Sequence, residues 1–190
     1  CGQELSGING VMRPGIVHRI DKDTTGSVIA CKNDQAHQSI ARQLKEHTIT
    51  RRYLAICHGV LKEDTGCIDR PIGRHPSDRK KMAVDVKNGK SAVTHFQVLA
   101  RYRQYTLVQC VLETGRTHQI RVHMTSIGHP LLGDTVYGSR RSPFQLEGQT
   151  LHAKTLGFLH PSTGKYVEVD APLPEYFTHL TEILLSNTSN

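Results

Sequence analysis

The chain has 190 residues and a net charge of +7, with a sequence pI near 9.3. This length suits one domain whose core needs neither a disulfide nor a metal to be stable. Its apolar runs are too short to span a membrane. The positive charge favours a polyanionic partner, and nucleic acid comes before an anionic membrane because no basic amphipathic helix is predicted.

The cysteines and histidines predict neither disulfides nor a metal site. The five cysteines stand alone, and three of them, Cys31, Cys57 and Cys110, fall in apolar runs. This pattern indicates reduced, mostly buried thiols in a cytoplasmic protein. His118 and His123 are five residues apart, which misses the spacing of helical metal ligands. The chain starts without a signal peptide pattern and without Met, so we expect it to be a fragment.

In chain order, short strands are expected at 16–20 and 27–32, on either side of a charged turn. Asn33 and Asp34 provide an N-cap, and Ala36, Ile40 and Leu44 recur at helical spacing, which predicts a helix over 34–47. Strands are then expected at 52–59 and 66–70, followed by a polar, basic loop over 71–90.

Two longer strands, 92–102 and 105–113, should form an antiparallel pair around a tight connection. Thr117 is a candidate N-cap for a helix over 118–127, which Gly128 would end.

The last part of the chain predicts a hairpin and a helix. The hairpin joins strands at 151–160 and 165–170, and the helix covers 175–185 with Phe177 and Leu180 on its inner face. The whole pattern predicts an α+β fold, with a mixed, largely antiparallel central sheet flanked by helices and loops.

The segment VHRIDKDTTGSV, residues 17–28, concentrates charge beside a predicted strand. In an extended segment Arg19 and Asp21 would share one face, and a carboxylate beside guanidinium groups stays ionised. Such a carboxylate suits a nucleophile or an electrostatic stabiliser. Two other interpretations are a simple Asp-Thr-Gly turn and the D-x-D-x-T motif of haloacid-dehalogenase-type phosphatases. The phosphatase would need a later acidic pair, where the sequence offers Asp134 but then Gly138.

Two further segments combine basic side chains with a possible site. In ETGRTHQIRVH a glycine turn leads into a helix whose start carries Arg116, His118, Gln119 and Arg121, which is typical of an anion site. In TRRYLAI, Tyr53 follows two arginines at the start of a strand. Taken singly, these segments also fit a solvated helix face and a core tyrosine.

Together and in this order, the motifs resemble the RluA-type pseudouridine synthases, in particular the RluD-like branch. HRIDKDTTG resembles the signature H-R-[LI]-D-x-x-T-[ST]-G, RRYLA the second motif, and TGRTHQIRVH…GHPLLGD…YG the third. GRHPSDRKKMAV and KSAVTHFQVL resemble the RluD-like branch, and the match runs over 15–171.

The resemblance implies the pseudouridine synthase fold, with residues 1–190 as a partial catalytic domain. The family's first strand and the S4-like domain of many RluD-like members would lie outside this sequence. It implies an enzyme that isomerises uridines to pseudouridine without cofactor or metal. The expected substrate is structured large-subunit (23S) ribosomal RNA with a flipped-out uridine, acted on by a monomer in the cytoplasm. The alternative is a non-catalytic RNA-binding or ribosome-assembly module.

The resemblance also implies roles for individual residues. Asp21 would be the essential carboxylate, which attacks the sugar, stabilises an oxocarbenium-like species or assists a proton shift. Arg121 would pair with Asp21, and Tyr53 would contact the base. Arg19 would fill the space left by the flipped uridine. The expected RNA contacts are completed by Arg116, His118, Gln119, Arg79, Lys80 and Lys81.

Overall fold

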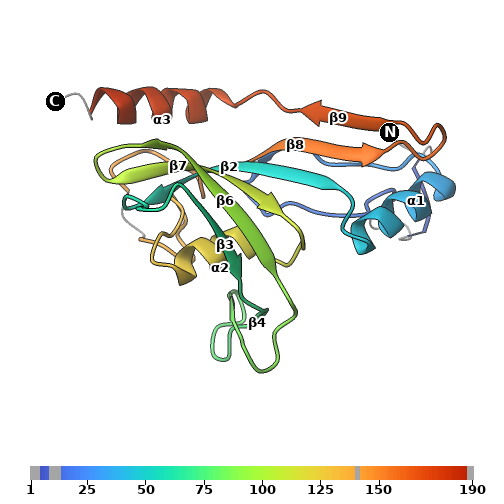
Figure 1. Ribbon diagram of the computed structural model, residues 1–190, viewed down its shortest axis with the longest axis horizontal. Coiled ribbons are helices and arrows are strands. Elements are labelled where there is room, and N and C mark those ends of the chain that lie inside the picture. Colours follow the sequence, from blue (N-terminus) through green and yellow to red (C-terminus); the bar gives the residue numbers. More distant parts are fainter. Residues whose placement is uncertain (1–4, 9–13, 140–141, 188–190) are drawn as a thin grey trace.

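The computed structural model describes residues 5–8, 14–139 and 142–187, which build a mixed main sheet, a two-stranded sheet and three helices (Figure 1). The main sheet has seven strands in the order β1-β8-β2-β7-β6-β3, with β9 also paired to β8. The strands are β1 (Thr25–Gly26), β2 (Thr50–His58), β3 (Thr65–Asp69), β6 (Val93–Arg101), β7 (Tyr105–Leu112), β8 (Leu151–Leu159) and β9 (Tyr166–Asp170). β1 runs parallel to β8, and the other named pairs are antiparallel. The predicted α+β fold with a largely antiparallel sheet is confirmed.

The helices are α1 (Asp34–Lys45), α2 (Gln119–Ser126) and α3 (Glu175–Ser186), and α2 and α3 lie on opposite faces of the sheet (Figure 1). Alternation along β2 explains this arrangement, because successive side chains of a strand point to opposite faces. Ala55 and Cys57 of β2 belong to one apolar cluster with Ile120 and Met124 of α2. The intervening residues, Leu54 and Ile56, join Phe177, Leu180 and Leu184 of α3 in another cluster.

The predicted helices and hairpins are confirmed with small changes at their ends. The α1 helix starts at the expected cap, where the Asn33 side chain accepts a hydrogen bond from the Ala36 N–H at 2.8 Å. Cys31, Cys57 and Cys110 are buried as predicted, whereas Cys67 is exposed and Cys1 lies outside the described residues. Among the described residues, none of the helices combines the length and apolar character needed to cross a bilayer.

The strands expected at 16–20 and 27–32 are wrong, since these segments share a single isolated bridge between Ile16 and Ala30. One cause of the missing strand pairing is a side chain. The His18 Nε2 accepts a hydrogen bond from the Ile29 N–H at 2.9 Å, in place of a backbone carbonyl. The strand forms instead inside the predicted turn, where Thr25 and Gly26 pair with β8.

Two further predictions are corrected. The loop expected over 71–90 contains a hairpin of β4 (Ile72–Arg74) and β5 (Met82–Val84). These strands are too short for a periodic signal, and they form because Ile72, Met82 and Val84 pack against Val122 of α2. Thr117 is not the N-cap of α2. That position belongs to His118, which has a φ of 56° and makes no side-chain capping bond.

Candidate active site

A cavity of about 480 Å³ lies between the segment 17–24, the start of β2 and the start of α2. Its volume falls in the usual range for sites that hold small molecules. Positively charged side chains outnumber negatively charged ones in its lining. The acidic residue is Asp21, and the basic residues are Arg19, Lys45, Arg51 and Arg116. The cavity therefore favours an anionic ligand.

Asp21 is placed at this cavity by a tight turn. The Thr24 N–H donates to the Asp21 carbonyl oxygen at 3.1 Å, and Asp23 adopts a left-handed φ of 67°. The buried Gln149 amide donates to the Lys22 carbonyl at 2.6 Å and to the Thr24 hydroxyl at 3.0 Å. The turn interpretation and the site interpretation of this segment are therefore compatible, because the turn presents the carboxylate.

Gly26 fastens this turn to the sheet. Its φ is +110°, and a Cβ at this position would lie 2.2 Å from the Ala153 carbonyl oxygen of β8. Only glycine permits both the backbone angle and so close an approach. The two-residue β1 therefore depends on this glycine to hold the Asp21 turn beside β8.

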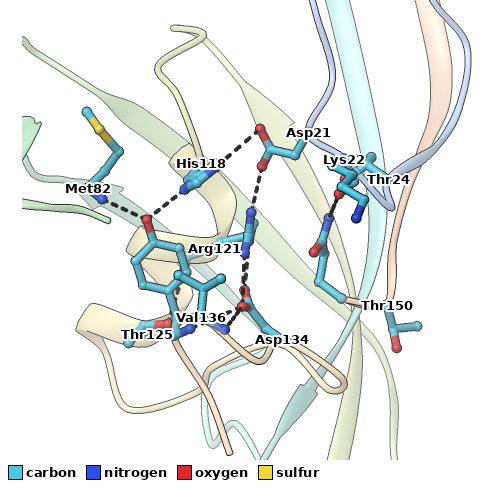
Figure 2. A network of polar contacts seen from close by, with 12 residues as sticks. Asp21, Lys22, Thr24, Met82, His118, Arg121, Thr125, Asp134, Val136 and Thr150 are labelled. Atoms are coloured by element: carbon cyan, nitrogen blue, oxygen red, sulfur yellow. Dashed lines mark hydrogen bonds and ion pairs between the residues drawn. The ribbon is translucent and has the colours of Figure 1, made fainter. Parts of the chain in front are cut away.

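Arg121 stands between two carboxylates, Asp21 and Asp134 (Figure 2). Its Nε and Nη2 donate to Asp134 at 2.7 and 3.0 Å, and its Nη1 lies 3.4 Å from the Asp21 Oδ2. Burial disfavours the charged forms of both Arg121 and Asp134. The hydrogen bonds and the opposite charges between these two side chains outweigh that effect, so the pKa of Arg121 is raised and the pKa of Asp134 is lowered. The predicted Arg121–Asp21 pair is present, although Asp134 is the closer partner.

His118 approaches the other side of Asp21 (Figure 2), with its Nε2 4.0 Å from Oδ1. Its Nδ1 shares a hydrogen bond of 2.7 Å with the Tyr137 hydroxyl, which also accepts the Met82 N–H at 2.8 Å. Burial is the main cause that lowers the pKa of His118, which favours the neutral imidazole. The Asp21 side chain is 15% exposed, which leaves it accessible from the cavity.

Tyr53 lines the same cavity as Asp21, from the face of β2 that also carries Arg51. Burial raises the pKa of Tyr53, an effect that Arg51 opposes and Asp21 reinforces. The phenol is thus protonated at neutral pH and can donate a hydrogen bond. Asp21, Tyr53 and Arg121, predicted together from separated motifs, meet at one site.

The predicted RNA contacts divide into three groups. Arg19, Arg116 and His118 line the cavity. Gln119 also lines it but is 3% exposed, and its amide bonds to Thr114, to the Arg116 N–H and to strand β6, so its geometry favours a structural role. Arg79, Lys80 and Lys81 lie outside the cavity, on the β4–β5 connection.

The sequence predicted no role at this site for Tyr137 or Arg51, and for Asp134 it offered one only under the phosphatase interpretation. Asp134 and Tyr137 lie in the quoted GHPLLGD…YG segment, and its resemblance to the third family motif was the available signal. The Asp134 Oδ1 accepts the Val136 and Tyr137 N–H groups at 2.9 and 3.1 Å. Asp134, which the phosphatase interpretation would need for a cation, is therefore occupied by Arg121 and by backbone donors. In the described part of the chain, no group of three or more His, Cys, Asp or Glu side chains gathers as metal ligands.

Comparison with known proteins agrees with this fold. Residues 3–126 match the sequence model for RNA pseudouridylate synthase, and the chain belongs to that family.

Among its relatives is an uncharacterized RNA pseudouridine synthase of Bacillus subtilis, YlyB, 59% identical over 97% of this chain and 60% of the relative. Another is ribosomal large subunit pseudouridine synthase D of Zymomonas mobilis, 48% identical over 100% of this chain and 62% of the relative. The chain thus spans about 60% of the length of these relatives.

The solved structure of human RNA pseudouridylate synthase domain containing 1 matches with a TM-score of 0.73 and 28% identity. This match covers 90% of the present chain and 79% of the human one.

Proposed function

We propose that this chain carries the active site of an RNA pseudouridine synthase whose substrate is large-subunit ribosomal RNA. One observation carries the proposal: Asp21 faces a basic cavity, backed by Arg121 and sharing that cavity with Tyr53, in a chain of the RNA pseudouridylate synthase family. The ribosomal substrate is supported by the names of several relatives, including the protein from Zymomonas mobilis. The protein is expected to act as a monomer.

The isomerisation breaks the C–N glycosidic bond of uridine, turns the uracil and rejoins it to the sugar through C5. The C5 proton is then lost and the N1 released from the sugar takes up a proton, so atoms balance without oxidation or hydrolysis. An ionised carboxylate serves each of the three roles open to Asp21, which are attack on the sugar, stabilisation of an oxocarbenium-like species and transfer of a sugar proton. The Arg121 Nη1, 3.4 Å from the Asp21 Oδ2, holds the orientation of this carboxylate.

The remaining roles concern binding and proton transfer. Tyr53, a partly buried phenol at the cavity, is placed to contact the uracil and to take part in the late proton transfer at C5. The uridine must leave its stack to enter the cavity, and the exposed Arg19 at the cavity wall is placed to occupy the vacated position. Phosphate contacts offset the cost of unstacking, which is a few kcal/mol.

The β4–β5 hairpin is proposed as an outer RNA contact. Arg79 and Lys80 are exposed on it, and the hairpin is tied to the site because the Met82 N–H donates to Tyr137, which bonds His118. Phosphates of the RNA that flank the target uridine are the expected partners of this loop.

Release of tritium from RNA labelled at uridine C5 tests the proposal. The full-length protein should release label from a large-subunit ribosomal RNA transcript, and Asp21→Asn should not, although it should still bind the RNA. Asp23→Asn is the matched control, because Asp23 is an exposed residue of the same turn and asparagine tolerates its φ of 67°. Equal release by wild type and Asp21→Asn would refute the role of Asp21, and RNA binding without any release would favour a non-catalytic module.

A further inference from the structure

Arg51 is a buried cation with unused hydrogen-bonding capacity. The residue is 7% exposed, and its Nη2 donates to the Glu113 carbonyl oxygen at 3.1 Å. Its Nε is buried and has no hydrogen-bond partner. No Asp or Glu side chain of the described residues forms an ion pair with it, which distinguishes it from Arg121 and Arg52.

The backbone around Arg51 is shaped to hold the guanidinium at the cavity. Arg51 and Gly115 both line the cavity, and a Cβ on Gly115 would lie 2.4 Å from the Arg51 Nη1. The absence of a side chain at position 115 thus leaves the space that the guanidinium occupies. Because burying an unpaired charge is costly, a position of this kind calls for an anion from outside the chain.

Arg52, the next residue in the chain, has the carboxylate partner that Arg51 lacks. Arg52 points to the opposite face of β2, where its Nη1 lies 3.2 Å from the Glu168 Oε1. Tyr53 returns to the face of Arg51, so Arg51 and Tyr53 line the cavity together. Any ligand that reaches Tyr53 therefore enters the field of the unpaired guanidinium.

We propose that Arg51 binds a phosphate group of the target nucleotide and so positions the uridine between Tyr53 and Asp21. This inference rests on the proposed RNA substrate. A phosphodiester supplies the missing negative charge and oxygens that accept from the guanidinium, whereas a uracil carbonyl would supply only the acceptor. Arg51 is thus a positioning residue, separate from the chemistry at Asp21.

Titration with uridine, uridine 5′-monophosphate and uridine 3′-monophosphate tests the assignment without any need for turnover. In the wild-type protein, at least one monophosphate should bind about tenfold or more tightly than uridine, and it should shift the NMR resonance of the Arg51 Nε–H. In Arg51→Gln this preference should fall to about one, while Arg51→Lys should retain part of it. Arg52→Gln is the matched control and should keep the full preference.

A second variant displaces the guanidinium without removing its charge. The Cβ of Gly115→Ala would lie 2.4 Å from the present position of Nη1 and would force the guanidinium to move, so this variant should also lose the preference for the monophosphate. An unmoved Nε–H resonance in the wild type, or an equal preference in Arg51→Gln, would overturn the proposal even if the protein forms pseudouridine. Conversely, a phosphate preference that depends on Arg51 in a protein that forms no pseudouridine would refute the proposed function and leave the phosphate site standing.

Discussion

Asp134 is predicted to support both the stability of the fold and the position of Asp21. Asparagine at this position keeps the size of the side chain, and its carbonyl oxygen can still accept the Val136 and Tyr137 N–H groups. It would, however, turn an NH₂ group toward the Arg121 Nε, which now donates to Asp134 at 2.7 Å. Asp134→Asn therefore replaces an ion pair with two opposed donors.

The magnitude follows from the burial of the pair, since the Asp134 and Arg121 side chains are 0% and 5% exposed. Breaking a buried ion pair by removing one partner costs about 3–5 kcal/mol. For a domain of this size each kcal/mol lowers Tm by about 2–4 °C, so Tm should fall by roughly 6–20 °C. Because the pKa of Asp134 is lowered, its contribution is present above the unfolded pKa near 4 and is lost as pH falls further.

Urea denaturation at pH 7 and at a pH below 4 measures this contribution. The control is Asp170→Asn, which removes the exposed ion pair with Lys154 and should cost far less. The difference between wild type and Asp134→Asn should be large at pH 7 and should narrow in acid. An Asp134→Asn protein as stable at pH 7 as Asp170→Asn would refute the reasoning. Pseudouridine formation should also fall in Asp134→Asn, because Arg121 loses the anchor that positions it against Asp21.

Two further outcomes are expected. Burial, and then the charge of Arg51, lower the pKa of His18 to about 4 from 6.5, so the free energy of unfolding should decrease as pH falls from 6.5 to 4. His18→Gln should reduce this decrease by roughly 2–3 kcal/mol in denaturant titrations. The same pH dependence of the free energy of unfolding in both proteins would contradict this prediction. Neutralising Arg79, Lys80 and Lys81 together should weaken RNA binding and lower its salt slope by about 2–3, and an unchanged slope would show that the loop faces elsewhere.

The sequence predicts best those elements whose determinants lie close together in the chain. The α1 helix follows from its Asn33 cap and apolar stripe, and the β6–β7 pair follows from alternation around a short connection. Asp21, Tyr53 and Arg121 were predicted because each sits in a dense local motif. Their meeting in space depends on the family resemblance, since 100 residues separate Asp21 from Arg121.

Features set by distant contacts were missed. The β4–β5 hairpin forms because it packs on Val122, and no periodic pattern within three-residue strands reveals such packing. The first segment forms a turn and a bridge because the His18 ring replaces a backbone acceptor. The pairing of Arg121 with Asp134 and the lack of a carboxylate beside Arg51 both depend on tertiary geometry, which residue types alone do not specify.

The unequal sharing of Arg121 has a consequence for any ligand that engages Asp21. Asp134 alone satisfies two of the guanidinium nitrogens, at 2.7 and 3.0 Å, while Asp21 stands at 3.4 Å. Asp21 can therefore rotate toward an incoming sugar, or lose its charge in a covalent bond, without stranding a cation in the protein interior. In the proposed reaction the counter-ion of Arg121 therefore stays constant while Asp21 changes state, so no step requires Arg121 to find a new partner.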